Sequence, residues 1–265
     1  MDAKSDWHRG SALIDPISPR LRTETPKAYA SRGATAATDI DPASDALGQA
    51  AVEPVTGGMI VGLGTGRYST RAIRALALKC QRMRMRVRCV CTSTASEELA
   101  HELGLETIPF ADVEEVDYLV DGADEVDHHL RMMKGQSGAI TRQRLVAHAA
   151  KRCVYLTSED KYVENLGTQA LLAVVIIPFG ISSTRARLRN LGLAGVVRRN
   201  MEGEVVVTDG GGVVLDMHIT GRNVEQLALD LDHVPGVVDH GLFLTEADEV
   251  LVEGKNGDVK RLTAG

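Results

Sequence analysis

Three carboxylates stand close together in the segment Asp-Gly-Ala-Asp-Glu at residues 121–125. The preceding Tyr-Leu-Val at 118–120 predicts a buried strand. Open α/β sheets keep their active sites at the carboxyl ends of strands, where a carboxylate pair can bind sugar hydroxyls or move protons. A helix N-cap with acidic residues in its first turn is one alternative. A divalent-metal site is another, but the adjacent His128 and His129 lack the i, i+4 spacing of a helical metal pair.

A glycine-rich turn, Gly64-Thr65-Gly66, is a second candidate for chemistry. It follows the apolar run 59–63 and precedes a helical pattern, so backbone N–H groups and the positive end of a helix dipole could hold an anion there. A tight turn without any ligand explains the same glycines. No Gly-Lys-Ser/Thr follows, and Ser69 stands where a dinucleotide fingerprint has its third glycine. The sequence therefore predicts neither a P-loop nor a dinucleotide site.

A third candidate is the loop Lys-Gly-Gln-Ser-Gly at residues 134–138. It places a cation just before the helical pattern of residues 141–150. A lysine beside a helix N-terminus can hold an anion, and an ordinary connecting loop is the alternative.

The elements around these loops alternate between strands and helices. Apolar runs predict strands at 59–63, 87–91, 105–109, 118–120 and 152–157, and helical patterns fall at 44–53, 69–79, 96–103 and 141–150. Strands and helices that alternate at this spacing indicate a mostly parallel, Rossmann-like α/β sheet with helices on both faces.

The pattern changes after residue 168. Strands are predicted at 173–177, 205–208, 213–218, 236–243 and 249–252, helices at 182–191 and 224–231, and a hairpin turn at the glycines of 209–212. We expect a smaller α+β domain over 169–243, with a Rossmann-like domain formed by 44–168 and roughly 244–265. Residues 1–43 hold four of the eight prolines and no periodic apolar face, which predicts a mobile N-terminal extension.

Composition narrows the possible partners. A net charge of −6 and an aromatic content of 3% over 265 residues argue against a protein that coats nucleic acid or stacks bases. No run of 18 apolar residues and no secretory signal is present, so we expect no membrane partner. The four cysteines do not form a disulfide framework and suit a reducing compartment. We therefore predict a cytoplasmic protein with no nucleic-acid partner.

Taken together, these segments resemble the A-type ribose-5-phosphate isomerases. The matching stretches keep the family's order from about residue 44 to the end: IVGLGTG (60–66), VDGADEVD (120–127), the lysine loop with TR (134–142), LTSEDKYVENLG (156–167), VVIIPFG (174–180), VVVTDGGGVVLDMH (205–218) and PGVVDHGLF (235–243). The resemblance implies interconversion of ribose 5-phosphate and ribulose 5-phosphate through an enediol, with no metal and no cofactor. It also implies a homo-oligomer, either a dimer or a tetramer.

The resemblance assigns site residues by position. Its substrate-binding residues fall on Thr65, Gly66, Arg67, Tyr68, Asp121, Gly122, Ala123, Asp124, Lys134, Gly135, Gln136, Ser137 and Lys161. The family's catalytic glutamate falls on Gln143, whose amide cannot take a C–H proton near neutral pH. The acid–base candidates that remain are the carboxylates of 121–125, above all Asp121 and Asp124.

Other departures from the family cluster at the same loops. Arg67 and Tyr68 stand where the first loop usually has Ser-Thr, the lysine loop departs from KGGGAA, and Ser44 or Asp45 replaces a lysine of the first helix. Arg67 is a candidate to replace that lysine as the phosphate partner. The leading interpretation is an aldose–ketose isomerase that acts on a phosphorylated pentose or a relative. The alternatives are other chemistry on a phosphorylated sugar, or a non-catalytic sugar-phosphate binder.

Overall fold

A seven-stranded sheet forms the larger part of the computed structural model, which describes residues 40–263. Its strand order is β14-β13-β7-β4-β1-β2-β3, and the neighbouring pairs are parallel except β13–β14. The strands are β1 (Ile60–Leu63), β2 (Arg88–Cys91), β3 (Glu106–Thr107), β4 (Tyr118–Gly122), β7 (Cys153–Ser158), β13 (Glu249–Glu253) and β14 (Val259–Thr263). The predicted mostly parallel α/β sheet is confirmed. The expected N-terminal extension lies outside the described residues, apart from residues 40–43.

Helices cover both faces of this sheet. Successive strand residues point to opposite faces, so Val120 packs in one core cluster with α1 and α2, while its neighbour Leu119 packs in another with α4. The helices are α1 (Ala46–Val52), α2 (Arg67–Met83), α3 (Thr94–Glu102) and α4 (Ile140–Ala149).

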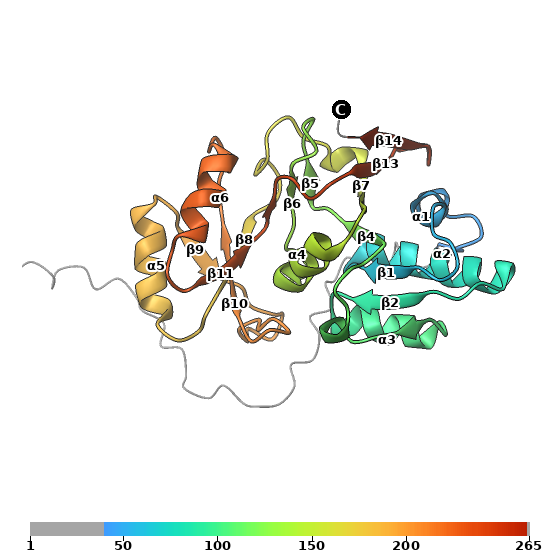
Figure 1. Ribbon diagram of the computed structural model, residues 1–265. Helices are drawn as coiled ribbons and strands as arrows, with labels where there is room; N and C mark the ends of the chain where they lie inside the picture. The colour runs from blue at the N-terminus through green and yellow to red at the C-terminus, as the bar shows by residue number, and fades with distance from the viewer. Residues whose placement is uncertain (1–39, 264–265) are drawn as a thin grey trace, which may run out of the picture.

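A four-stranded antiparallel sheet with the order β11-β8-β10-β9 lies at the other end of the molecule (Figure 1). Its strands are β8 (Leu172–Ile176), β9 (Gly195–Val197), β10 (Val213–Met217) and β11 (Val237–His240), and its helices are α5 (Ile181–Asn190) and α6 (Val224–Asp232). Ala173 and Val175 of β8 share a core cluster with Ile140 of α4, so α4 packs against both sheets. Figure 1 shows α4 between them. The domain boundaries given above stay a prediction.

A small third sheet was not predicted. It has the order β12-β6-β5 and consists of β5 (Glu125–Val126), β6 (Met132–Met133) and β12 (Leu242–Phe243). Strands of two residues leave no periodic pattern in the sequence. Two 3₁₀ turns, η1 (Phe110–Asp112) and η2 (Glu159–Lys161), complete the elements that the structure describes.

Two of the expected strands differ in the structure. Residues 205–208 form no strand and contribute only isolated bridges, which pair Val205 with Arg199 and Val207 with Val213. The expected strand 236–243 is divided at Gly241 into β11 and β12. The division arises because the Lys134 N–H donates to the Gly241 carbonyl at 2.8 Å, and a Cβ on Gly241 would overlap the Lys134 carbonyl. Within the described residues, no helix combines the length and apolar character needed to cross a bilayer.

Candidate functional site

The glycine-rich turn meets the acidic segment where β1 and β4 end side by side. The Gly64 N–H donates to the Val120 carbonyl at 2.9 Å. A Cβ on Gly64 would overlap the Asp121 carboxylate, so only glycine allows this approach. Gly66 then begins α2 with a φ of +108°, a conformation that favours glycine.

Asp121 is the centre of the site and is fully buried. Its Oδ1 accepts hydrogen bonds from the N–H groups of Thr65 and Gly122, at 3.1 and 2.7 Å, and from the Ser69 hydroxyl at 3.0 Å. Its Oδ2 lies 3.0 Å from Lys134 Nζ. Because both charges are buried, each needs the other and the surrounding donors to offset its desolvation.

Lys134 points into the interior from the end of β6, with a side chain that is 2% exposed. Its ammonium also donates to the Gly122 carbonyl and lies 5.1 and 5.5 Å from the ring centroids of Tyr155 and Phe243. The lysine loop and the acidic segment therefore meet in the structure. The β5–β6 hairpin produces it, because the Asp124 N–H donates to the Met133 carbonyl at 2.8 Å.

Gln143 comes from the first turns of α4 and is also buried. Its Nε2 donates to Asp121 Oδ1 at 3.1 Å, and its Oε1 has no hydrogen-bond partner among the described residues. The amide therefore stands against the central carboxylate, at the position where the resemblance places a glutamate.

Asp124 differs from Asp121 in its surroundings. It is half-buried, and its Oδ2 accepts from the Gln136 N–H at 2.9 Å. Burial raises the pKa of Asp124 above the ordinary 3.8, while that N–H and the nearby cations Lys161, Lys134 and Arg198 act in the opposite direction. Asp124 thus holds a proton more readily than a solvated aspartate does.

A cationic cluster surrounds Tyr68 at the N-terminus of α2. The Arg67 guanidinium donates to the Tyr68 hydroxyl at 2.8 Å, and that hydroxyl donates to Ser158 Oγ at 2.6 Å. Lys161, at the end of η2, has its Nζ 5.7 Å from the Tyr68 ring centroid. No side chain caps α2 at this end. Two cations and a helix dipole therefore favour an anion here.

Hydroxyl groups that sequence reasoning missed extend the site toward α3. Thr65 Oγ1 lies 2.7 Å from Thr92 Oγ1 and 2.8 Å from Ser93 Oγ. Ser93 is the N-cap of α3 and forms a capping box with Ser96. The Ser-x-x-Ser spacing signals the cap, but nothing in the sequence signals its contact with Thr65.

Four other positions singled out in the sequence lie outside the central Asp121–Lys134 contacts. Ala123 is buried, and Ser137 Oγ accepts a long 3.5 Å hydrogen bond from the Ala139 N–H. Gln136 is exposed at the tip of the lysine loop. Asp45, at the replaced lysine position, caps α1 and pairs with the buried Arg71 at 2.7 Å, so it serves the scaffold.

Within the residues that the structure describes, the acidic segment neither begins a helix nor joins a cluster that could hold a metal ion. The helix N-cap is wrong, because the chain continues from Asp124 into β5. Glu125 is fully buried and accepts from the N–H groups of Gly167 and Ala170, both at 2.6 Å, and of Gln169, so it anchors a loop. Among the described residues, no group of three or more His, Cys, Asp or Glu side chains could hold a metal ion.

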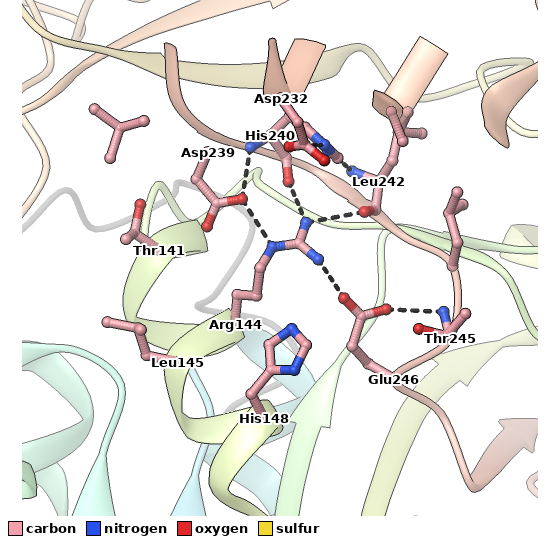
Figure 2. Close-up of a pocket in the computed structure, with 13 residues that line it drawn as sticks. Thr141, Arg144, Leu145, His148, Asp232, Asp239, His240, Leu242, Thr245 and Glu246 are labelled. Carbon is pink, nitrogen blue, oxygen red and sulfur yellow. Dashed lines mark hydrogen bonds and ion pairs between the residues drawn. The ribbon is translucent and has the colours of Figure 1, made fainter. Parts of the chain in front are cut away.

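A cavity of about 430 Å³ lies on a different face of α4 (Figure 2). Arg144 stands at its centre, where it pairs with Asp239 and Glu246 and donates to the carbonyls of His240 and Leu242. None of the predicted site residues lines this cavity. Because carboxylates already neutralise its central cation, we do not assign the predicted chemistry to it.

Comparisons with known proteins agree on one family. The family model described as ribose 5-phosphate isomerase A (phosphoriboisomerase A) matches residues 88–257. The ribose-5-phosphate isomerase A of Caulobacter sp. (strain K31) is 42% identical over 219 residues, covering 80% of this chain and 94% of the relative. The solved ribose 5-phosphate isomerase A of Methanocaldococcus jannaschii is 30% identical, with a TM-score of 0.77 over 82% of this chain and 96% of that one. A D-ribose-5-phosphate isomerase solved with phospho-erythronic acid is 28% identical, with a TM-score of 0.78 and the same coverage.

Proposed function

The chain belongs to the ribose 5-phosphate isomerase A family, and we propose that it interconverts ribose 5-phosphate and ribulose 5-phosphate, or a closely related pair of phosphorylated sugars, through an enediol. The observation that carries this proposal is the meeting of three loops at the buried Asp121–Lys134 pair, which lies 3.0 Å apart. A structural relative solved with phospho-erythronic acid supports a phosphorylated ligand of this size.

We assign the phosphate of the substrate to the cluster around Tyr68. Arg67 supplies a fork of donors and Lys161 a point charge, and both stand at the uncapped N-terminus of α2. An arginine fork and helix N–H groups are well suited to a phosphate. Arg67 takes over the charge that the family's lysine supplies in the first helix.

We assign the proton transfer to Asp124. Its raised pKa and partial exposure suit a group that must take a proton from a ligand. Asp121 is less suited, because it is fully buried, four donors converge on its Oδ1, and Lys134 lies 3.0 Å from its Oδ2. In the proposed reaction, Asp124 removes the C2 proton of the open-chain aldose and returns a proton to C1, while the C2 hydroxyl proton passes to the C1 oxygen. The Lys134 cation stabilises the charge that develops on the substrate oxygen.

A second candidate function is sugar-phosphate binding without turnover. Gln143 favours it, because the amide at the family's glutamate position cannot act as a base. Both functions require the same phosphate cluster, and only the first requires Asp124 to exchange protons.

The direct test is turnover of ribose 5-phosphate by the purified protein, followed by ¹³C NMR, with unphosphorylated ribose as the control. We expect ribulose 5-phosphate to form. Arg67→Ala should weaken binding of the phosphorylated sugar by about 1.5–3 kcal/mol, as for a hydrogen bond to a charged group, and should hardly affect ribose. Binding without conversion would support the second function, and equal losses for both sugars would contradict the phosphate assignment.

We also propose that the protein works in the cytoplasm as a homo-oligomer. Its four cysteines are free, which suits a reducing compartment. Phe179 is 93% exposed, and large exposed apolar groups often mark subunit contacts. Light scattering of the purified protein should give a mass of at least two chains; a monomer would contradict this part.

A further inference from the structure

Arg198, directly after β9, reaches from the four-stranded sheet to the lysine loop. Its Nη1 donates to the backbone carbonyl of Gly135 at 2.6 Å and to that of Gln136 at 3.3 Å. Asp216 of β10 holds the same guanidinium, with Nε 2.9 Å from Oδ2 and Nη2 paired to Oδ1. Since a bidentate carboxylate fixes the direction of an arginine fork, the guanidinium has one preferred orientation toward the loop.

The lysine loop is held from two sides. Its Gln136 N–H donates to Asp124, and its carbonyls at 135 and 136 accept from Arg198. Gly135 has a φ of +132°, and a Cβ there would lie 2.5 Å from the Ala173 side chain. The backbone of the loop therefore packs directly on β8 at Gly135. Its position is set by the hydrogen bonds to Asp124 and Arg198.

We propose that Arg198 is a positioning residue, which holds the lysine loop from the four-stranded sheet so that Asp124 and Lys134 keep their places in the site. This inference rests on the proposed function, because it assigns Arg198 to the same reaction. Arg198 acts through the loop and not on the substrate, since Asp216 and two carbonyls occupy its guanidinium.

The charge of Arg198 also affects the pKa of Asp124, which can be measured separately from activity. The cations that face Asp124 are Lys161, Lys134 and Arg198, and each lowers the pKa that burial raises. Removal of the Arg198 charge should therefore move the titration of Asp124 to higher pH. A lysine at 198 keeps a cation but loses the fork that spans two carbonyls. The effect of the charge on the pKa of Asp124 can therefore be separated from the effect of the hydrogen bonds on the loop.

The experiment compares Arg198→Met and Arg198→Lys with the control Arg199→Met. Arg199 is exposed in the same hairpin and bonds the Gly203 carbonyl instead of the loop. Three quantities are measured: hydrogen exchange of the Gln136 amide, the ¹³C titration of the Asp124 carboxyl, and kcat and KM for ribose 5-phosphate.

We expect Arg198→Met to accelerate exchange at Gln136 by about tenfold or more, the lower end of what a hydrogen bond to a charged group is worth. The Asp124 titration and the acid limb of kcat/KM should move to higher pH. KM should rise by about tenfold because the loop binds substrate, and kcat should fall by about threefold or more because Asp124 loses its fixed position. Arg198→Lys should show the faster exchange and higher KM with the wild-type acid limb. Arg199→Met should match the wild type.

The proposal is overturned if folded Arg198→Met matches Arg199→Met in Gln136 exchange and Asp124 titration. It is also overturned if the Gly167 amide, held by Glu125, accelerates as much as Gln136, because that would show general loosening. If Arg198→Met does not fold, Arg198→Lys and Asp216→Asn decide the matter, and wild-type exchange at Gln136 in both contradicts the proposal. A wild-type protein that does not convert ribose 5-phosphate refutes the proposed function, whereas exchange and titration still test Arg198.

Discussion

At the scale of single residues, the two aspartates of the acidic segment have different environments although their sequence context is alike. Asp121 is fully buried and paired with Lys134, while Asp124 is half-buried and meets one backbone N–H. The sequence predicts that both stand at the end of a strand. It cannot distinguish them, because the donors to Asp121 come from residues as distant as Thr65 and Gln143.

Gln143→Glu tests how much the amide at this position lowers the rate of turnover. We expect turnover of ribose 5-phosphate to rise by ~10²-fold or more, the usual worth of a general base. The new carboxylate would lie against Asp121, whose Oδ1 is now 3.1 Å from the amide nitrogen. Two charged carboxylates repel each other, so the melting temperature should fall more at pH 8 than at pH 5. A folded variant that binds substrate but gains no activity would show that the amide does not limit turnover and that Asp124 alone serves as the base.

The pH dependence tests Asp124 as the base. A base must be deprotonated, so activity should be lost as pH falls through the pKa of Asp124, which burial places above 3.8. Asp124→Asn should lower kcat by ~10²-fold or more and remove this acid limb. The measurement is kcat against pH for both proteins. An unchanged acid limb in a folded Asp124→Asn variant would assign the base elsewhere.

At the scale of elements, the helices and most strands of the seven-stranded sheet were predictable from apolar patterns, whereas β9, β14 and the hairpin strands β5 and β6 were not. The pattern of residues 141–150 predicts α4, which buries one face, and the apolar run 118–120 predicts β4, whose two faces are both buried. The β5–β6 hairpin, which brings Asp124 to Lys134, has strands of two residues and no such pattern. The site therefore depends on an element that only the folded chain reveals.

Glu125→Gln tests the anchor at the start of that hairpin. The buried Glu125 carboxylate accepts from three backbone N–H groups of the loop after η2, the turn that ends at Lys161. In the glutamine variant the side-chain NH₂ would face backbone N–H groups, and at least one of these donors would lose its acceptor. We therefore expect the free energy of unfolding to fall by about 1.5–3 kcal/mol. Urea denaturation measures it, with the exposed Glu202→Gln as control. A loss no greater than that of the control would contradict the anchoring role.

At the scale of the whole molecule, the site lies where the two larger sheets meet. The seven-stranded sheet supplies Asp121 and the turn at Gly64. The four-stranded sheet supplies Arg198 and the hairpin residue Asp209. Asp209 accepts from the Thr94 N–H at the start of α3 and from Arg142 of α4 at 3.1 and 3.0 Å. The sequence predicts the hairpin turn at 209–212 but not that it contacts both helices, since contacts between distant segments leave no local pattern.

Asp124 is the residue that we propose to move a proton between two carbons of a phosphorylated sugar. The most direct measurement is isomerisation of ribose 5-phosphate in D₂O, followed by NMR, with wild type and Asp124→Asn side by side. We predict deuterium at C1 of the ribulose 5-phosphate formed by the wild type, and at least ~10²-fold slower incorporation in the variant. Undiminished turnover by Asp124→Asn, or no ribulose 5-phosphate from a wild-type protein that binds the sugar phosphate, would contradict this role of Asp124.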